Sequence, residues 1–446
     1  MAQPKRATTK TPVPVLTPLA PVNATKALGH HSEPAVAINP TNPKNVVAGC
    51  NSPTGAVEIM VSNDGGLTWA KRILGTGTGP GGDGLPKSFC DPSIAFDRFG
   101  NGYFVYLDLS ERCVLVRSKN GGVTFTDPVT IAGPGTDQPT VAAGPGVTAS
   151  TASVWVTFRN SSGSISARGA QATALGTVGA FGAEFGAPGS NGGNFGDVAI
   201  GPKGQVMVTY QLPANNQGPS AIFVNLKPDG TGQGPFGGPI KVTNTNVGGF
   251  DVIPAQSSRT IDAEAGLAWD CAHSQHNGRV YLLYTEEPVA ESNDTDVLIR
   301  FSDDDGATWS KPVKVSDDKK KRSQFLCKLA LDQTTGNLGA IFYDCRRDDG
   351  TIGPGSTNSV PNDDVHVFAT ASNNGAATWA KNIQITKGVS NGSNSSNPNE
   401  LADYIGLAFN KGVMQAAWTD NSNSTGDNPD GPLHGGDIYI AQIKVV

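Results

Sequence analysis

The chain has 446 residues, a formal net charge of −6 and only 16% charged residues, and it contains 56 glycines and 31 prolines. A composition so rich in turn formers disfavours helical bundles, coiled coils and helical solenoids. Hydrophobic residues make up 37%, which argues against global disorder, and the acidic balance argues against nucleic acid as a partner.

The N-terminal residues 1–11 are polar, basic and proline-containing, and we expect them to form a flexible tail without a secretory signal. Residues 12–446 are predicted to form a single domain. No run of about 18 apolar residues occurs, so we expect no membrane insertion.

A short apolar strand centred on an alanine recurs along the chain, roughly 60 residues apart. The central residues are Ala37, Ala95, Ala142, Ala199, Ala268, Ala330 and Ala408. Each is followed by further strand-forming segments, such as residues 103–109 and 280–284. These seven units predict an all-β fold, a single β-propeller of four-stranded blades whose small-residue strands crowd round a central channel.

The last unit ends at Val446 directly after its third strand. Residues 12–24, PVPVLTPLAPVNA, are predicted to supply the missing outer strand and to close the ring, because a propeller hides its strand edges. Prolines are tolerated in such an edge strand. A six-bladed ring is the alternative, and it would require two of the units to merge.

Four segments share the same order of residues: a serine, an acid or amide, a glycine, a threonine and a final aromatic residue. They are residues 62–69 (SNDGGLTW), 118–125 (SKNGGVTF), 302–309 (SDDDGATW) and 372–379 (SNNGAATW). We expect Asp64, Asn120, Asp304 and Asn374 to accept hydrogen bonds from backbone amides of a tight turn between the third and fourth strands of a blade. Their role is therefore predicted to be structural.

These segments resemble the Asp-box, S-x-D-x-G-x-T-W, of the bacterial neuraminidase repeat in sialidase-like propellers. The first and third copies fit fully, the second has Asn120 and Phe125 for Asp and Trp, and the fourth has Asn374 and a displaced glycine. The resemblance implies a propeller that acts on or binds acidic glycans at the channel mouth, as an exo-sialidase-like glycosidase if active. It also implies an extracellular or cell-surface location.

Sialidases resemble one another in an arginine cluster that grips a carboxylate, a Tyr–Glu nucleophile pair and an Asp acid/base. The resemblance implies that Tyr404 is the nucleophile and that Asp91 is the acid/base. It carries the base beside the tyrosine to Glu264, Glu286 or Glu287. It implies that Arg159, Arg346 and Arg347 bind the carboxylate of the substrate. The arginine that the family has near the start of its first blade has no match in this chain.

Charged and amide residues also recur where first strands begin and second strands end, which places them on one rim of a propeller. Those before first strands are Glu33, Asp91, Asp137, Asp197, Asp262, Glu264 and Asp403. Those after second strands include Asp344 and Asp420, which with Asp403 are candidate substrate-binding residues. The alternative is structural: the acids cap loop amides, and Arg346 pairs with Asp344 or Asp348.

No cofactor is certain. A carboxylate-rich rim, or residues 293–296 (NDTD), offers the hard oxygen ligands that Ca²⁺ prefers, although the sequence does not identify the metal ligands. A glycan or glycoconjugate is the expected partner. The alternative function is a non-catalytic propeller that binds glycan or protein on a cell or particle surface.

Overall fold

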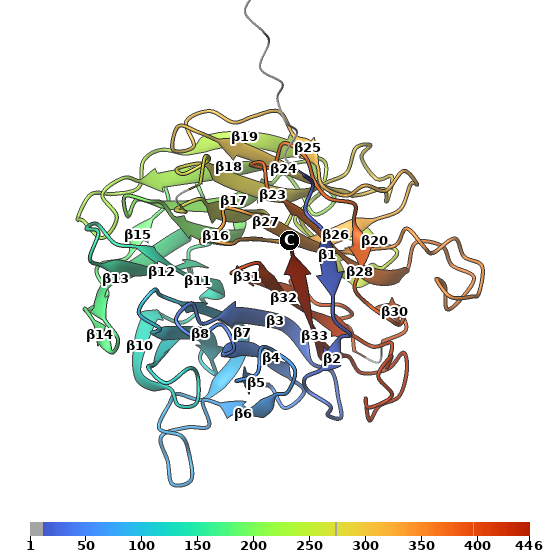
Figure 1. Ribbon diagram of the computed structural model, residues 1–446, viewed down its shortest axis with the longest axis horizontal. Coiled ribbons are helices and arrows are strands. Elements are labelled where there is room, and N and C mark those ends of the chain that lie inside the picture. The colour runs from blue at the N-terminus through green and yellow to red at the C-terminus, as the bar shows by residue number, and fades with distance from the viewer. Residues whose placement is uncertain (1–11, 273, 396) are drawn as a thin grey trace, which may run out of the picture.

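The computed structural model describes residues 12–272, 274–395 and 397–446. All regular secondary structure within these ranges is β-strand. Seven small sheets stand round a central axis, a seven-bladed β-propeller (Figure 1). The tail predicted for residues 1–11 lies outside the described residues. No helix long and apolar enough to span a bilayer occurs in the described part of the chain.

Each blade runs outward from the channel in chain order. Blade 1 holds β3 (Ser32–Ile38), β4 (Val46–Ser52), β5 (Ala56–Ser62) and β6 (Ala70–Leu74). Blade 2 holds β7 (Ser88–Phe96), β8 (Gly102–Asp108), β9 (Cys113–Ser118) and β10 (Thr126–Ala132). Blade 3 holds β11 (Asp137–Pro145), β12 (Ala152–Arg159), β13 (Ile165–Ala174), β14 (Thr177–Val178) and β15 (Phe185–Gly186). Blade 4 holds β16 (Asn194–Ile200), β17 (Val206–Pro213), β18 (Ser220–Lys227) and β19 (Ile240–Thr245).

Blade 5 follows an extra hairpin, β20 (Asp251–Ile253) and β21 (Gln256–Ile261), which we call the mouth hairpin. Blade 5 holds β22 (Gly266–Trp269), β23 (Val280–Glu286), β24 (Asp296–Ser302) and β25 (Val313–Lys314). Blade 6 holds β26 (Gln324–Leu331), β27 (Leu338–Asp344), β28 (Asp364–Ser372), β29 (Ile383–Gln384) and β30 (Ser390–Asn391). Blade 7 holds β31 (Gly406–Asn410), β32 (Val413–Asp420) and β33 (Asp437–Val445), with β1 (Leu16–Pro18) and β2 (Val22–Asn23) outside them.

The N-terminal strands close the ring, as the sequence predicts. β1 and β2 both pair antiparallel with β33, placing Leu16 opposite Val445 and Val22 opposite Ile440 (Figure 1). Buried hydrogen bonds fix this closure, because Thr25 Oγ1 donates to Asp437 at 2.6 Å. The last blade therefore has no bare edge beside β33, and the count is seven blades rather than six.

The four repeated segments form the turns between the third and fourth strands of blades 1, 2, 5 and 6. In the first, Asp64 Oδ1 accepts hydrogen bonds from the backbone N–H groups of Leu67 and Thr68, each at 3.0 Å. Trp69 Nε1 donates back to the carbonyl of Gly66 at 3.1 Å. The turn is thus held by its own side chains, at the opposite end of the blade from the starts of the first strands.

The hydrophobic core lies between neighbouring blades rather than at the axis. One cluster joins Val47 and Val57 of blade 1 to Phe104 and Val116 of blade 2, all buried. Close approach is essential here, since a Cβ on Gly49 would lie 2.5 Å from the ring of Phe104. Because each blade buries both faces against its neighbours, the ring forms a rigid frame for the loops at its ends.

Candidate functional site

The first strands bend at one matched position where they enter the channel. Five residues there have left-handed backbone conformations with φ between 42° and 56°: Glu33, Asp91, Gln138, Glu264 and Leu326. The strand register shifts next to this position in blades 1, 2, 3 and 6. Each such non-glycine residue costs about 1–2 kcal/mol, so five approach the net stability of a domain and must be held by tertiary contacts.

A cavity of about 630 Å³ opens at this end of the channel. Its acidic wall contains Asp91, Asp137, Asp262 and Asp403, and Tyr404 lies beside them. Residues 258–261 of the mouth hairpin form another part of the wall. The volume falls in the range of small-molecule sites, which suits one or a few sugar rings.

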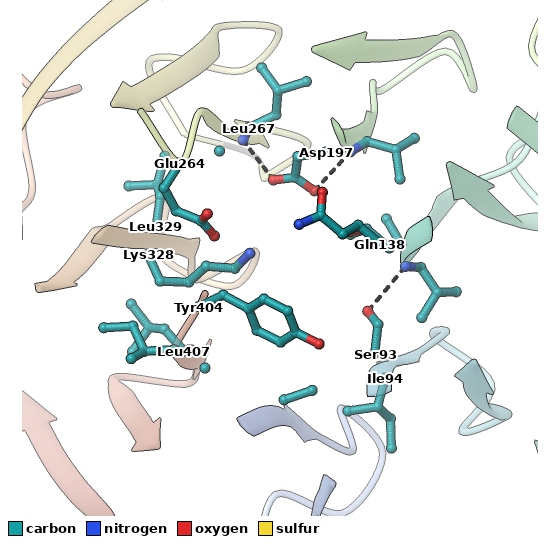
Figure 2. Close-up of a pocket in the computed structure, with 18 of the residues that line it drawn as sticks. Ser93, Ile94, Gln138, Asp197, Glu264, Leu267, Lys328, Leu329, Tyr404 and Leu407 are labelled. Carbon is teal, nitrogen blue, oxygen red and sulfur yellow. Dashed lines mark hydrogen bonds between the residues drawn. The ribbon is translucent and has the colours of Figure 1, made fainter. Parts of the chain in front are cut away.

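The channel continues below this mouth as a narrower space of about 240 Å³, and Gln138 and Tyr404 line both parts. Figure 2 shows the side chains of Glu264, Lys328 and Tyr404 pointing into the channel from three different blades. Asp197 is tied to the wall, because its Oδ2 accepts the backbone N–H of Leu267 at 2.8 Å. The channel is therefore polar although its strands are built on small apolar residues.

Arg259 of the mouth hairpin joins two of the acidic side chains. Its Nε donates to Asp403 Oδ1 at 2.7 Å, while Nη2 contacts both Asp403 Oδ2 and, at 3.4 Å, Glu33 Oε1. The other oxygen of Glu33 accepts Asn51 Nδ2 at 2.5 Å. Glu400 also fixes the hairpin, because its side chain accepts the backbone N–H of Arg259 at 3.1 Å. Asp403 and Glu33 thus both already contact the guanidinium.

Burial and mutual repulsion keep protons on several of these acids. Burial, Asp137 and Asp403 raise the pKa of Asp91 to about 6. Burial raises the pKa of Glu264 to about 8, with Lys328 opposing and Asp403 adding to the shift. Burial raises the pKa of Glu33 well above its usual range, and Asp91 adds to the effect. Groups that titrate at such different pH values in one cavity are suited to acid and base roles.

Burial also raises the pKa of Tyr404, and the negative charges of Glu33 and Asp91 raise it further. The phenol is therefore held in its neutral form. For Arg259, burial alone would lower the pKa, but the carboxylates of Asp403 and Glu33 outweigh it and raise the value. The guanidinium is a permanent charge in this site.

Four of the residues selected from the sequence come together at the channel: Tyr404, Glu264, Asp91 and Asp403. Asp137, Asp197 and Asp262 join them on the same walls. Some of these acids also cap backbone groups of the next blade, as the structural alternative expects, since Asp91 Oδ2 accepts the N–H of Gln138 at 3.2 Å.

The arginines selected from the sequence do not line either part of the channel in the described residues. Arg159 Nε donates to the carbonyl of Gly193 at 3.3 Å. Arg346 binds Asp344 through Nε at 2.7 Å and Asp317 through Nη1 at 2.5 Å, while Asp348 takes no part in this pair. Arg347 is exposed beside Arg346 in a surface depression of blade 6.

Three further candidates have structural contacts elsewhere. Glu286 lies between blades 4 and 5, where a side-chain oxygen accepts the N–H of Asn246 at 3.0 Å. Glu287 accepts the backbone N–H groups of Glu291 and Asn293. Asp420 accepts Trp418 Nε1 at 3.0 Å and the N–H of Ser422 at 2.8 Å. These interactions satisfy the side chains without a ligand.

Sequence reasoning missed Arg259 and Lys328. Lys328 stands two residues before the central Ala330, the position that lines the channel in the other blades, so the repeat contained a usable signal. Arg259 belongs to no repeat position. The only sign of its hairpin was the long interval between Ala199 and Ala268.

Comparison with known proteins finds remote structural similarities only. No family model matches it, and no curated protein matches it. Among solved structures, a protein of unknown function from Dyadobacter fermentans has 12% identity and TM-score 0.49, with 97% of this chain and 99% of that chain covered. The endosialidase of phage phi92 has 12% identity and TM-score 0.49, covering 97% and 69%. A lectin from Burkholderia pseudomallei has 11% identity and TM-score 0.49, covering 80% and 84%. Similarity at this level carries no argument about activity.

Proposed function

We propose that this propeller takes a glycan through the channel mouth into the channel and hydrolyses a glycosidic bond there by carboxylic acid–base chemistry. The observation that carries the proposal is the pair Asp91 and Glu264, whose pKa values are raised to about 6 and about 8. Asp91 lines the mouth at the start of blade 2, and Glu264 lines the narrower part of the channel below it, just before blade 5. Hydrolysis of a glycosidic bond needs one carboxyl group that is protonated and one that is ionised near neutral pH.

The order of the two pKa values assigns the roles. Glu264 is the proton donor to the oxygen of the leaving sugar, and Asp91 is the base that takes a proton from the attacking water. The water oxygen then bonds to the anomeric carbon as the glycosidic C–O bond breaks. This exchanges the roles that the family resemblance implies for these two residues.

The chemistry of the mouth favours an uncharged sugar. The wall is dominated by carboxyl groups, which repel an anion, and Arg259 is already engaged by Asp403 and Glu33. A tyrosine whose pKa is raised is also a weak nucleophile, which argues against direct attack by Tyr404. Tyr404 instead offers a hydroxyl and a ring face to a sugar.

A second candidate retains the acidic glycans of the sialidase-like resemblance. Arg346, Arg347, Lys320 and Lys381 line a surface depression of about 640 Å³ on blade 6. Three of these cations, Lys320, Arg347 and Lys381, are exposed. An anionic sugar would bind there without catalysis, which corresponds to a glycan-binding surface propeller. An extracellular or cell-surface location is part of both proposals.

Turnover of chromogenic glycosides tests the first proposal, with neutral pyranosides, neutral furanosides and sialosides measured separately. We expect hydrolysis of a neutral glycoside that falls about 10²–10⁴-fold in Glu264→Gln and Asp91→Asn. Glu286→Gln, which changes a carboxylate outside the channel, retains wild-type turnover. Turnover unaffected by the first two variants would refute the assignment.

Retention on a glycan array without turnover would instead support the binding propeller. Loss of that retention in Arg347→Ala together with Lys381→Ala would place the acidic-sugar site on blade 6. Sialoside hydrolysis that is lost in Tyr404→Phe would restore the sialidase-type mechanism.

A further inference from the structure

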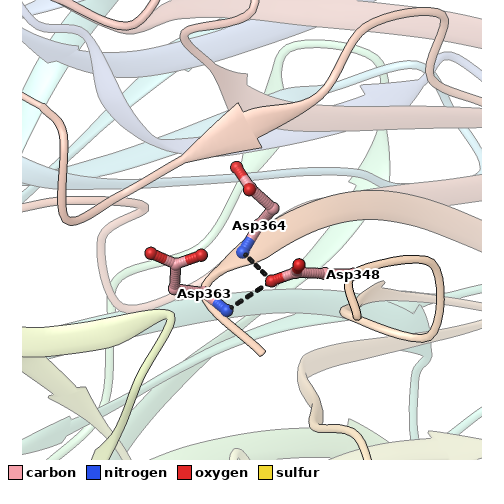
Figure 3. A group of neighbouring side chains, drawn as sticks. All are labelled: Asp348, Asp363 and Asp364. Atoms are coloured by element: carbon pink, nitrogen blue, oxygen red, sulfur yellow. Dashed lines mark hydrogen bonds between the residues drawn. The ribbon is translucent and has the colours of Figure 1, made fainter. Parts of the chain in front are cut away.

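Three aspartates of blade 6 gather where the long loop of residues 345–363 meets β28. One carboxylate oxygen from each of Asp348, Asp363 and Asp364 lies within 4.8 Å of the other two (Figure 3). The residues are exposed by only 1%, 4% and 0%. Three acidic groups therefore share a space that solvent barely reaches, away from the channel mouth described above.

Most of their hydrogen-bond donors carry no charge. Asp348 Oδ2 accepts the backbone N–H groups of Asp363 and Asp364 at 2.8 and 3.0 Å (Figure 3). Asp364 accepts the hydroxyl of Thr357 at 2.7 Å and Asn391 Nδ2 at 3.0 Å. Among the ion pairs of the described residues, none links a lysine, arginine or histidine to any of the three.

Asp363 supplies an independent observation at the cluster. Its Oδ2 accepts Asn358 Nδ2 at 2.9 Å, but its Oδ1 is fully buried without a hydrogen-bond partner in the described part of the chain. Figure 3 shows this carboxylate beside those of Asp348 and Asp364. A buried carboxylate oxygen without any partner is costly and is expected to bind a cation or a proton.

We propose that Asp348, Asp363 and Asp364 bind a calcium ion. The donor set is all oxygen, which excludes the nitrogen and sulfur sites that zinc prefers. Calcium accepts 6–8 oxygen ligands in irregular loop geometry, whereas magnesium requires a near-ideal octahedron. The cation would compensate the three carboxylates and fill the place beside Asp363 Oδ1.

The ion would also brace the channel mouth. Asn391, the partner of Asp364, begins the segment of residues 391–404 that carries Asp403 and Tyr404. Ser393 of this segment donates to the carbonyl of Pro254 in the mouth hairpin at 3.0 Å. Removal of calcium should therefore loosen residues 345–363, 391–395 and 397–404 before the rest of the ring.

Isothermal titration of chelator-stripped full-length protein with CaCl₂ tests the site. We expect saturable binding of one ion, in the range of about 10⁻⁶ to 10⁻³ M that calcium modules span, and weaker binding of MgCl₂. At saturating calcium the melting temperature should rise by about 2 °C or more. Hydrogen exchange should slow in residues 345–363, 391–395 and 397–404.

Asp363→Asn should weaken calcium binding at least about tenfold, because it removes one of the three charges. Asp349→Asn changes the adjacent exposed aspartate and should bind as the wild type does. If Asp363→Asn does not fold, the stripped wild type and Asp348→Asn provide the same comparison. The absence of saturable heat from wild-type protein, unchanged affinity in Asp363→Asn, or preference for magnesium would overturn the proposal.

Discussion

Arg259 and Asp403 are 144 residues apart in the chain, yet the guanidinium of one grips both oxygens of the other at the channel mouth. The contact joins the hairpin that precedes blade 5 to the segment that precedes blade 7. It also brings a permanent positive charge next to Glu33 of blade 1. One side chain thus connects three sectors of the ring at the place where the acidic groups meet.

Replacement of Arg259 by leucine should destabilise the protein by about 1–3 kcal/mol, because it leaves two largely buried carboxyl groups without their cation. The partly exposed guanidinium keeps the expected cost below that of a fully buried pair. Lys26→Met is the control, since Lys26 pairs with Asp427 at an exposed site and should cost less than about 1 kcal/mol. Urea unfolding at pH 7 measures both. Equal costs would mean that the Arg259 pair is no more than a surface contact.

Glu264 should make the stability of the protein fall as the pH rises. Its pKa is about 8 in the folded protein against an ordinary value of 4.5, so the folded state binds more protons between these values. Glu264 therefore contributes a negative slope of unfolding free energy against pH from about pH 4.5 to 8. Glu264→Gln should flatten it, as thermal unfolding at several pH values will measure. Glu184→Gln, at an exposed position, should retain the wild-type slope.

The ring closure should depend on a single buried hydroxyl. Thr25 Oγ1 donates to Asp437 at 2.6 Å and accepts the N–H of Ile438 at 2.9 Å. Thr25→Val should therefore cost about 1–3 kcal/mol, because it leaves the buried N–H of Ile438 without a partner and removes one of the donors to Asp437. Thr17→Val, on exposed β1, should be nearly neutral. Denaturant unfolding compares the two, and similar stabilities would show that the strand pairing alone closes the ring.

The repeated turns should tolerate an amide but not an apolar side chain. Asn120 and Asn374 accept the N–H of the threonine four residues later at 3.0 Å, as Asp64 does. Asp64→Asn should therefore cost less than Asp64→Ala, which we expect to lose about 1 kcal/mol. Hydrogen bonds from Thr68 lower the pKa of Asp64 to about 2, so its contribution is complete above about pH 4 and fades toward pH 2. Unfolding at pH 7 and pH 2.5 measures both effects.

The seven blades were predictable because the pattern that specifies them is local. Each central alanine is surrounded by a strand of matched residues, and the missing strand of the last unit pointed to residues 12–24 for closure. The positions of Asp91, Glu264, Asp403 and Tyr404 follow from the same pattern, because residues at equivalent positions of the repeat lie at the same end of the channel. Arg346 shows the limit of this reasoning, because position near a second strand left open whether it binds a ligand or pairs with Asp344, and it gave no sign of Asp317.

The amino-acid sequence by itself determined the architecture, since hydrophobic period, turn residues and repeat spacing act over a few neighbours at a time. Only the tertiary structure decided the chemistry of the mouth and the aspartate cluster of blade 6. Proton affinity depends on burial and on charges a few ångströms away, and those charges come from residues hundreds of positions apart. Asp363 lies beside Asp364 in the chain, but only the folded loop after β27 brings Asp348 next to them and buries the unpartnered oxygen of Asp363.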